Sequence, residues 1–360
     1  MKSPLQAGGA SSARSPAIQL AWLGLFYAAY FGFVGLYTPF LGPYLKSTGH
    51  GLNVIALALG SMQAMRIVGP LIWGWLADRT RLRVRWLRLG ALAGLVCSGF
   101  VFLEVHSTVA LLLAIVCMNL AVSGLVPLAD AHAMDVCHGS PGMYGRVRVY
   151  GSVGFVATVL GFGWCADFLG YTSYAVWVWC ALALAFVAAC GFQEPGSSRA
   201  IGYFAASSSP ELPNQHFSVS SNVQAKPQLS RSRFGLRLLL QPRDLQLFWL
   251  AAFFMLFAHG VLYAFFSLYL QEYGYSEFRI GFLWAFGVVC EIVFFALQRT
   301  LFHKLSLVMW LRVSFLACAV RFAMLAAFPG FSGCCSWHKP AIVSLLQHTT
   351  PLPWPGCAQG

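Results

Sequence analysis

The sequence predicts an all-α polytopic membrane protein. Hydrophobic residues make up 58% of its 360 residues and charged residues only 9%, which leaves too few polar groups to solvate a globule of this size. Three stretches without a charged side chain, 17–45, 105–129 and 168–193, exceed the roughly 20 apolar residues that cross a bilayer. The net charge of +12 fits the basic loops of a membrane protein better than a nucleic-acid partner.

Nine helices are predicted, with bounds that follow the apolar runs and the Gly, Pro and charged residues between them. They cover residues 17–42, 52–77, 86–104, 107–133, 149–169, 172–192, 245–271, 278–300 and 305–328.

The charges of the short loops predict the orientation. Basic residues gather in alternate loops, namely Arg79, Arg81, Arg83, Arg85, Arg88, Arg146, Arg148, Arg299 and Lys304. The other loops hold few Lys or Arg. By the positive-inside rule the basic side is cytoplasmic. We therefore expect residues 1–16 to be a cytoplasmic tail and the protein to reside in a bacterial inner membrane.

A polar segment divides the chain into two halves. Residues 194–243 are rich in Ser, Pro, Gln and basic residues and are predicted to be a flexible cytoplasmic linker. The linker separates an N-terminal six-helix half, 17–193, from three helices within 244–328. A faint repeat with an offset of 225 residues aligns Arg66 with Glu291, so each half places an ionisable residue at an equivalent depth.

Charges inside the predicted spans are the candidate functional groups, because a charge at the bilayer centre costs about 2.5–3.5 kcal/mol. The candidates are Arg66, Asp130, Arg148, Glu291, Arg312 and Arg321. Arg312 lies near a span end, where its side chain can snorkel to the interface. Arg148 lies near an end too, so its position fits either the positive-inside rule or a function. Glu291 is flanked by uncharged residues on both sides, which favours a functional role.

No enzyme motif accompanies these charges. The eleven cysteines form no CxxC pair and no Cys/His cluster with metal spacing, and we find no nucleophile motif or cofactor fingerprint. We therefore expect no enzymatic activity, metal or cofactor. The expected partners are a small-molecule solute and the lipid bilayer, with no nucleic acid, and the expected state is a monomer.

The segment Gly74-Trp-Leu-Ala-Asp78-Arg79-Thr-Arg81-Leu-Arg83 resembles the loop motif of the major facilitator superfamily. In that family the motif follows the second helix, and its Asp and basic residues latch neighbouring helices on the cytoplasmic side. The resemblance implies a gating role for Gly74, Asp78, Arg79 and Arg83. The Gly that usually follows the Asp-Arg-x step is replaced by Arg81.

Two further segments resemble the 3-phenylpropionate permease branch, which is related to lactose permease. They are Val126-Pro-Leu-Ala-Asp130 and Tyr144-Gly-Arg-Val-Arg148-Val-Tyr-Gly-Ser-Val-Gly-Phe155. The resemblance implies that Asp130 pairs with Arg148 at the substrate site and that Phe155 occupies the position of an aromatic that stacks on sugar. Phe155 has no polar group, which argues against a sugar. By the same resemblance Glu291 couples substrate to proton binding, near Arg321.

The resemblance ends near residue 328. The tail 329–360 contains five prolines and no apolar run of spanning length, so we expect a C-terminal half lacking its last helices through truncation or a frameshift. A genuinely divergent tail is the alternative explanation. Three hypotheses follow: a proton-coupled transporter of a small, possibly aromatic-carboxylate, solute that works by alternating access; a non-transporting fragment of one; and, most remotely, a membrane-embedded enzyme.

Overall fold

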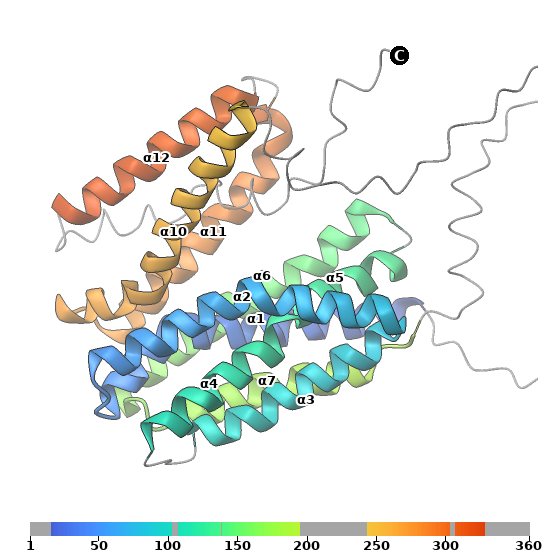
Figure 1. Ribbon diagram of the computed structural model, residues 1–360, viewed down its shortest axis with the longest axis horizontal. Helices are drawn as coiled ribbons and strands as arrows, with labels where there is room; N and C mark the ends of the chain where they lie inside the picture. Colours follow the sequence, from blue (N-terminus) through green and yellow to red (C-terminus); the bar gives the residue numbers. More distant parts are fainter. Residues whose placement is uncertain (1–15, 103–106, 138, 195–242, 303–306, 328–360) are drawn as a thin grey trace, which may run out of the picture. The chain divides into compact units, whose positions relative to one another are not determined.

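The computed structural model describes residues 16–102, 107–137, 139–194, 243–302 and 307–327 (Figure 1). These residues form ten α-helices and no strand. The helices are α1 (Pro16–Ser47), α2 (Leu52–Thr80), α3 (Arg83–Phe102), α4 (Thr108–Ser123), α5 (Leu125–Val136), α6 (Pro141–Leu169), α7 (Tyr174–Cys190), α10 (Arg243–Glu272), α11 (Glu277–Phe302) and α12 (Leu307–Ala327). Nearly all of the predicted linker and the whole of the predicted tail 329–360 lie outside the described residues.

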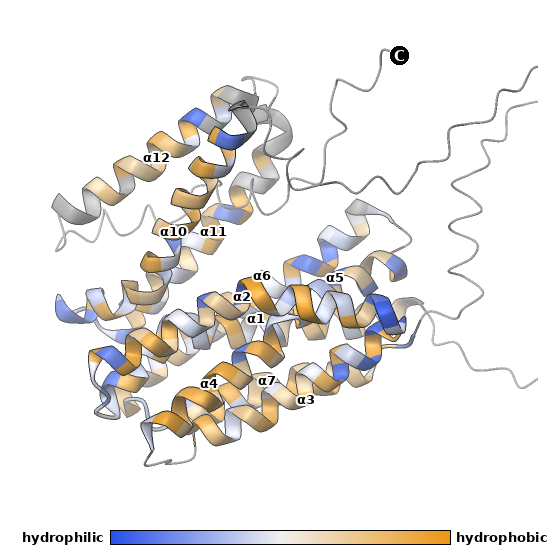
Figure 2. Ribbon diagram, in the orientation of Figure 1, coloured by the Kyte–Doolittle hydropathy of each residue, from blue (hydrophilic) through white to orange (hydrophobic). Residues whose placement is uncertain are grey.

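Six helical segments in the described residues are long and apolar enough to cross a membrane: 17–47, 52–80, 83–102, 108–136, 142–169 and 246–272. A seventh apolar helix, Tyr174–Cys190, is shorter. Helices α11 and α12 form where the sequence predicts the eighth and ninth spans. Figure 2 shows apolar residues along most of α1 to α7, with hydrophilic residues gathered toward one end of α2, α3 and α6.

The predicted fourth span is broken into α4 and α5 at Gly124. Two features explain the break. Pro127 has no backbone N–H to donate to the carbonyl four residues earlier, and its ring crowds that carbonyl. In addition, the ring of Trp73 packs so closely on Gly124 that a Cβ there would overlap it. The sequence therefore predicted this segment as one apolar span, as found over 108–136, but did not predict the interruption at Gly124.

Two predicted loops prove to be mostly helical. Helix α6 begins at Pro141 rather than near residue 149, so Arg146 and Arg148 lie within the helix instead of in a loop. Proline suits the first position of a helix because its missing N–H would have no partner there. Likewise α2 extends to Thr80 and α3 begins at Arg83, which reduces the arginine-rich loop to a two-residue turn in which Arg81 has φ 58°.

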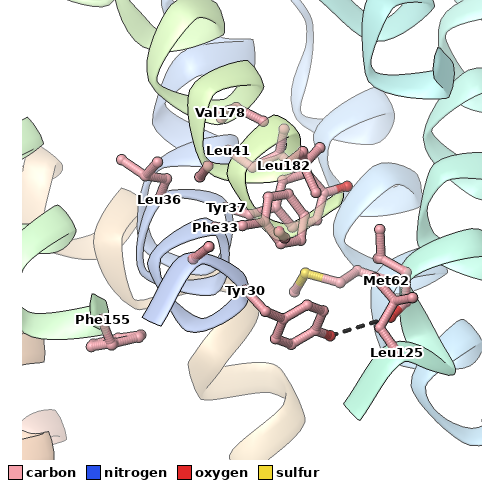
Figure 3. Close-up of a cluster of buried hydrophobic side chains, with 14 of the residues drawn as sticks. Tyr30, Phe33, Leu36, Tyr37, Leu41, Met62, Leu125, Phe155, Val178 and Leu182 are labelled. Atoms are coloured by element: carbon pink, nitrogen blue, oxygen red, sulfur yellow. Dashed lines mark hydrogen bonds between the residues drawn. The ribbon is translucent and has the colours of Figure 1, made fainter. Parts of the chain in front are cut away.

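Helix α1 is the most extensively packed helix of the first seven, with α6 and α7 as its main neighbours. It approaches α6 very closely at Gly154, where a Cβ would overlap the backbone of Ala28. Aromatic side chains of α1 fill the adjoining core, and the rings of Phe33 and Tyr37 stack with centroids 5.1 Å apart. Figure 3 shows these rings beside Leu182 and the side chain of Met62 beside Leu125.

Helices α3, α4, α5 and α7 complete this bundle. Helix α3 packs on α4 and α7, and α2 packs on α4. Arg88 of α3 donates hydrogen bonds to the carbonyls of Ala189, Cys190 and Phe192 at the C-terminal end of α7. The last carbonyls of a helix lack partners within the helix, and a cation is favourable at this end of the helix dipole. Arg88 therefore fixes α3 against α7.

The described residues fall into two compact units, one with those of 16–194 and 262–327 and the other with 243–261. Within the first unit α11 packs on α6. The Asp167 carboxylate near the end of α6 accepts the backbone N–H groups of Glu277 (2.7 Å) and Phe278 (3.3 Å) in the first turn of α11. A carboxylate there satisfies unpaired N–H groups and complements the helix dipole. Lys46 and Glu272 form an exposed ion pair on the same unit.

Candidate solute site

Asp130 of α5 and Arg148 of α6 form the centre of the candidate site. Arg148 Nε lies 3.9 Å from Asp130 Oδ1, so the ion pair that the resemblance implies does form. The pair is partly accessible, with about a quarter of the Arg148 side chain and a third of the Asp130 side chain exposed. At 3.9 Å the two atoms attract each other without a direct hydrogen bond. The carboxylate and the guanidinium thus remain able to hydrogen-bond a third group.

Helix α1 supplies further contacts of this pair. The Tyr27 hydroxyl donates a 2.6 Å hydrogen bond to Asp130 Oδ1. The Arg148 guanidinium carbon lies 4.1 Å from the ring centroid of Phe31 and 5.1 Å from that of Tyr27, both within the range of cation–π attraction. Gly151, one turn after Arg148, leaves room for the Phe31 ring, which a Cβ there would crowd. Three helices therefore converge on one charged pair.

Sequence reasoning did not identify Tyr27 and Phe31. A signal was present, because α1 has aromatic residues at helical spacing and its tyrosines carry polar groups into a span without charges. Such a pattern is equally typical of a packed core, and Phe26, Phe33 and Phe40 of the same helix are indeed buried in the core. Only the packing of α1 on α6 shows which aromatic residues of α1 contact the charged pair and which belong to the core.

Phe155 of α6 lies in the hydrophobic core. Its side chain is 6% exposed and belongs to the main hydrophobic cluster, and its backbone closely approaches Gly35 of α1. Figure 3 shows Phe155 well separated from Tyr30 and Tyr37 of α1. In this arrangement Phe155 presents little surface on which a solute could stack.

The two candidate residues of the second half lie on separate helices. Glu291 lies on α11 and is half-buried. Arg321 lies on α12, and its side chain is outside the described set. The expected proximity of these two residues stays a prediction.

The predicted gating residues lie around the turn between α2 and α3. Arg83 Nη1 lies 2.7 Å from Asp135 Oδ2, which ties α3 to α5, and Asp135 had not been singled out from the sequence. The side chains of Asp78 and Arg79 are exposed, and the Arg79 guanidinium lies over the Trp75 ring. Gly74 is half-buried within α2.

No metal site is apparent in the described part of the chain, where no three His, Cys, Asp or Glu side chains are grouped to hold an ion. A groove of about 450 Å³ runs between α3 and α7, away from the charged pair. It is lined by Leu95, Val96, Gly99, Trp179, Cys180 and Ala183. Because this lining is apolar, the groove suits lipid chains better than a polar solute.

Comparison with known proteins agrees with this arrangement. The Escherichia coli (strain K12) protein named "Probable 3-phenylpropionic acid transporter" is 30% identical over 310 residues, which cover 85% of this chain and 74% of that protein. The maltose permease of Geobacillus stearothermophilus is 26% identical over 309 residues, covering 85% of this chain and 70% of the permease. A crystal structure of a mutant nucleoside transporter NupG matches with a TM-score of 0.64 at 13% identity, covering 90% of this chain and 80% of NupG.

The fold and these relatives define the class of the protein as a multi-pass membrane transporter of the major facilitator type, and not an enzyme. The sequence matches the family model of the MFS_1 like family over residues 20–337. The chain therefore belongs to the MFS_1 like family.

Proposed function

We propose that this protein imports a small aromatic carboxylate together with a proton across a bacterial inner membrane. The observation that carries the proposal is the partly accessible Asp130–Arg148 pair, held by Tyr27 and Phe31 within the membrane-spanning bundle. A charged pair at this depth is costly unless it serves a solute or ion pathway. The aromatic rings beside it suit an aromatic solute, and one relative is named for transport of 3-phenylpropionic acid.

In this proposal the solute binds near Asp130 and Arg148, and Glu291 of α11 carries the coupled proton. A half-buried carboxyl group can exchange a proton when its surroundings change between two conformations. The close contact of α6 with α11 would then be one of the contacts that open and close during alternating access. We further propose a monomeric protein with a cytoplasmic N-terminus, and a latch on the cytoplasmic side formed by Gly74, Asp78, Arg79 and Arg83.

Counterflow of labelled 3-phenylpropionate in proteoliposomes tests the proposal, with proton influx followed by a pH-sensitive dye in the lumen. We expect both signals in the wild type. Glu291→Gln should keep counterflow but lose proton influx, because an amide cannot carry the proton. The matched control is Glu194→Gln, which alters an exposed carboxylate beyond α7 whose role as acceptor of the Arg85 N–H an amide oxygen can replace.

Protein-free liposomes set the background, since the neutral acid crosses lipid unaided. Counterflow no greater than this background would contradict the proposal and favour the alternative of a non-transporting chain. Counterflow with proton influx that survives Glu291→Gln would contradict the role of Glu291 alone.

A further inference from the structure

A second arginine, Arg66, lies within the membrane-spanning helix α2 with its side chain exposed, and the charged pair does not explain it. It occupies the midpoint of α2, fourteen residues from each end of Leu52–Thr80. At that depth neither helix end is near enough for the guanidinium to reach the interface readily. A charge in this position calls for partners or water within the protein.

The partners of Arg66 are neutral. Arg66 Nη2 donates to the Thr38 hydroxyl and Nη1 donates to the Gln63 side-chain oxygen, both at 3.3 Å. The ion pairs among the described residues are Lys46–Glu272, Arg83–Asp135 and Arg148–Asp130, so Arg66 takes part in none of them. Two neutral acceptors orient the guanidinium but leave its positive charge uncompensated.

The sequence offers few carboxylates that could reach this depth. Of its eleven acidic residues, only Asp130 and Glu291 lie more than three residues inside a described helix. Asp130 is already bound by Tyr27 and paired with Arg148. The Arg148 charge is thus matched within the protein, whereas the charge of Arg66 is not. An incoming anion gains more from Arg66 than from Arg148.

The spacing of the two α1 residues that contact Arg148 and Arg66 suits a small solute. Phe31, which contacts Arg148, and Thr38, which contacts Arg66, are seven residues apart and lie on one face of α1. At 1.5 Å per residue the separation is about 10 Å along the helix. That span is comparable to the length of a phenyl ring carrying a short carboxylate chain.

Neutral polar groups surround this part of α1. The Tyr30 hydroxyl donates to the Val122 carbonyl. The buried Asn119 amide donates to the Ser61 hydroxyl. Figure 3 shows Tyr30 and Tyr37 extending from α1 in this region. Such groups can hydrogen-bond a carboxylate without repelling it.

We propose that Arg66, oriented by Thr38 and Gln63, is the binding site for the carboxylate of the solute, separate from the Asp130–Arg148 pair. This inference rests on the proposed function, because that function identifies the bound anion as the transported solute. In this arrangement the acid group binds Arg66, and the aromatic part extends along α1 toward Phe31. Arg66 then selects acids over neutral aromatic compounds.

Equilibrium binding of 3-phenylpropionate and its neutral amide, 3-phenylpropionamide, to the purified full chain tests the inference. The wild type should bind the acid more tightly than the amide. Arg66→Gln should weaken binding of the acid by roughly 10- to 100-fold, the usual worth of a hydrogen bond to a charged group, and leave the amide unaffected. Arg66→Lys should retain intermediate affinity. The control Arg279→Gln removes an equal charge from an exposed position on α11 and should change neither ligand.

Thermal unfolding shows whether each variant is folded. If Arg66→Gln does not fold, the variant Thr38→Val tests the inference in its place. Thr38→Val removes only the hydroxyl that orients Arg66 and should weaken the acid several-fold. Unchanged acid binding in the folded Arg66→Gln variant, or in Thr38→Val, would overturn the inference. So would a wild type that binds neither ligand at millimolar concentration, or binds both equally. If the protein shows counterflow but binds the acid equally well without Arg66, the transport function stands and the Arg66 site is wrong. If binding depends on Arg66 but no counterflow is seen, the anion site stands and the transport function is wrong.

Discussion

At the scale of single residues, the charged pair is determined by three different helices. Asp130 follows Pro127 on α5, Arg148 lies in the third turn of α6, and Tyr27 and Phe31 come from α1. The Asp130 carboxylate lies near both the hydroxyl of Tyr27 and the Arg148 guanidinium. Tyr27 therefore determines how freely Asp130 can move toward Arg148.

The change Tyr27→Phe tests this dependence. Hydrogen bonds between membrane helices average about 0.6 kcal/mol, and those to a charged group reach about 1.5–3 kcal/mol. Because Asp130 is one-third exposed, the lower part of that range applies, and we expect a loss of about 1 kcal/mol in unfolding free energy. Reversible unfolding in mixed micelles measures it. Tyr273→Phe, at an exposed position in the turn after α10, is the control and should be neutral. Equal stability of the two variants would contradict the role of Tyr27.

At the scale of helices, close backbone approach decides where α1 and α6 meet. Side-chain packing, rather than the hydrophobic effect, drives association of helices in lipid, and small residues allow that approach. Gly154 is the point of closest contact with Ala28, while Gly145, about two and a half turns earlier on the same helix, has open space around it. The two glycines have the same chemistry but opposite surroundings.

The substitutions Gly154→Ala and Gly145→Ala are therefore expected to have opposite effects. At Gly154 the added methyl group would meet backbone that cannot move aside, and we expect destabilisation of about 1–3 kcal/mol or more. At Gly145 alanine meets nothing and has the better helix propensity, so a gain of up to about 1 kcal/mol is expected. Thermal unfolding of the two variants side by side provides the measurement. A stable Gly154→Ala variant would show that α1 and α6 are less closely packed than described.

At the scale of the whole molecule, the distribution of basic residues determines how the chain is inserted. Arg83 and Arg88 both lie at the start of α3, where they also hold α5 and α7. The same positive charges therefore serve the positive-inside rule and the packing of this end of the bundle. We expect this end to be cytoplasmic.

Thiol labelling in intact cells tests the orientation, in a background without the native cysteines. Arg81→Cys in the turn between α2 and α3 should stay unlabelled by a membrane-impermeant maleimide until the cells are opened. His50→Cys in the turn between α1 and α2 should react at once. The reverse pattern would contradict a cytoplasmic N-terminus, whereas labelling of both sites only after lysis would indicate that His50 is occluded.

Much of the fold followed from local sequence. Apolar runs of spanning length and the polar breaks between them predicted every described helix, because a bilayer requires each span to satisfy its own backbone hydrogen bonds. The errors were local as well. The helix break at Gly124 and the early start of α6 at Pro141 depended on a neighbouring ring and on a proline that begins a helix rather than ending one.

By itself the sequence determined which residues are charged within the spans and, by resemblance, that Asp130 and Arg148 belong together. Only the tertiary structure decided what surrounds them. Tyr27 meets Asp130 across 103 residues, and Arg66 meets Thr38 across 28 residues of chain. Such contacts depend on how each helix is rotated and how closely it packs on its neighbours. No local pattern specifies that rotation, because an aromatic or hydroxyl side chain at helical spacing suits a buried core and a solute pathway equally well.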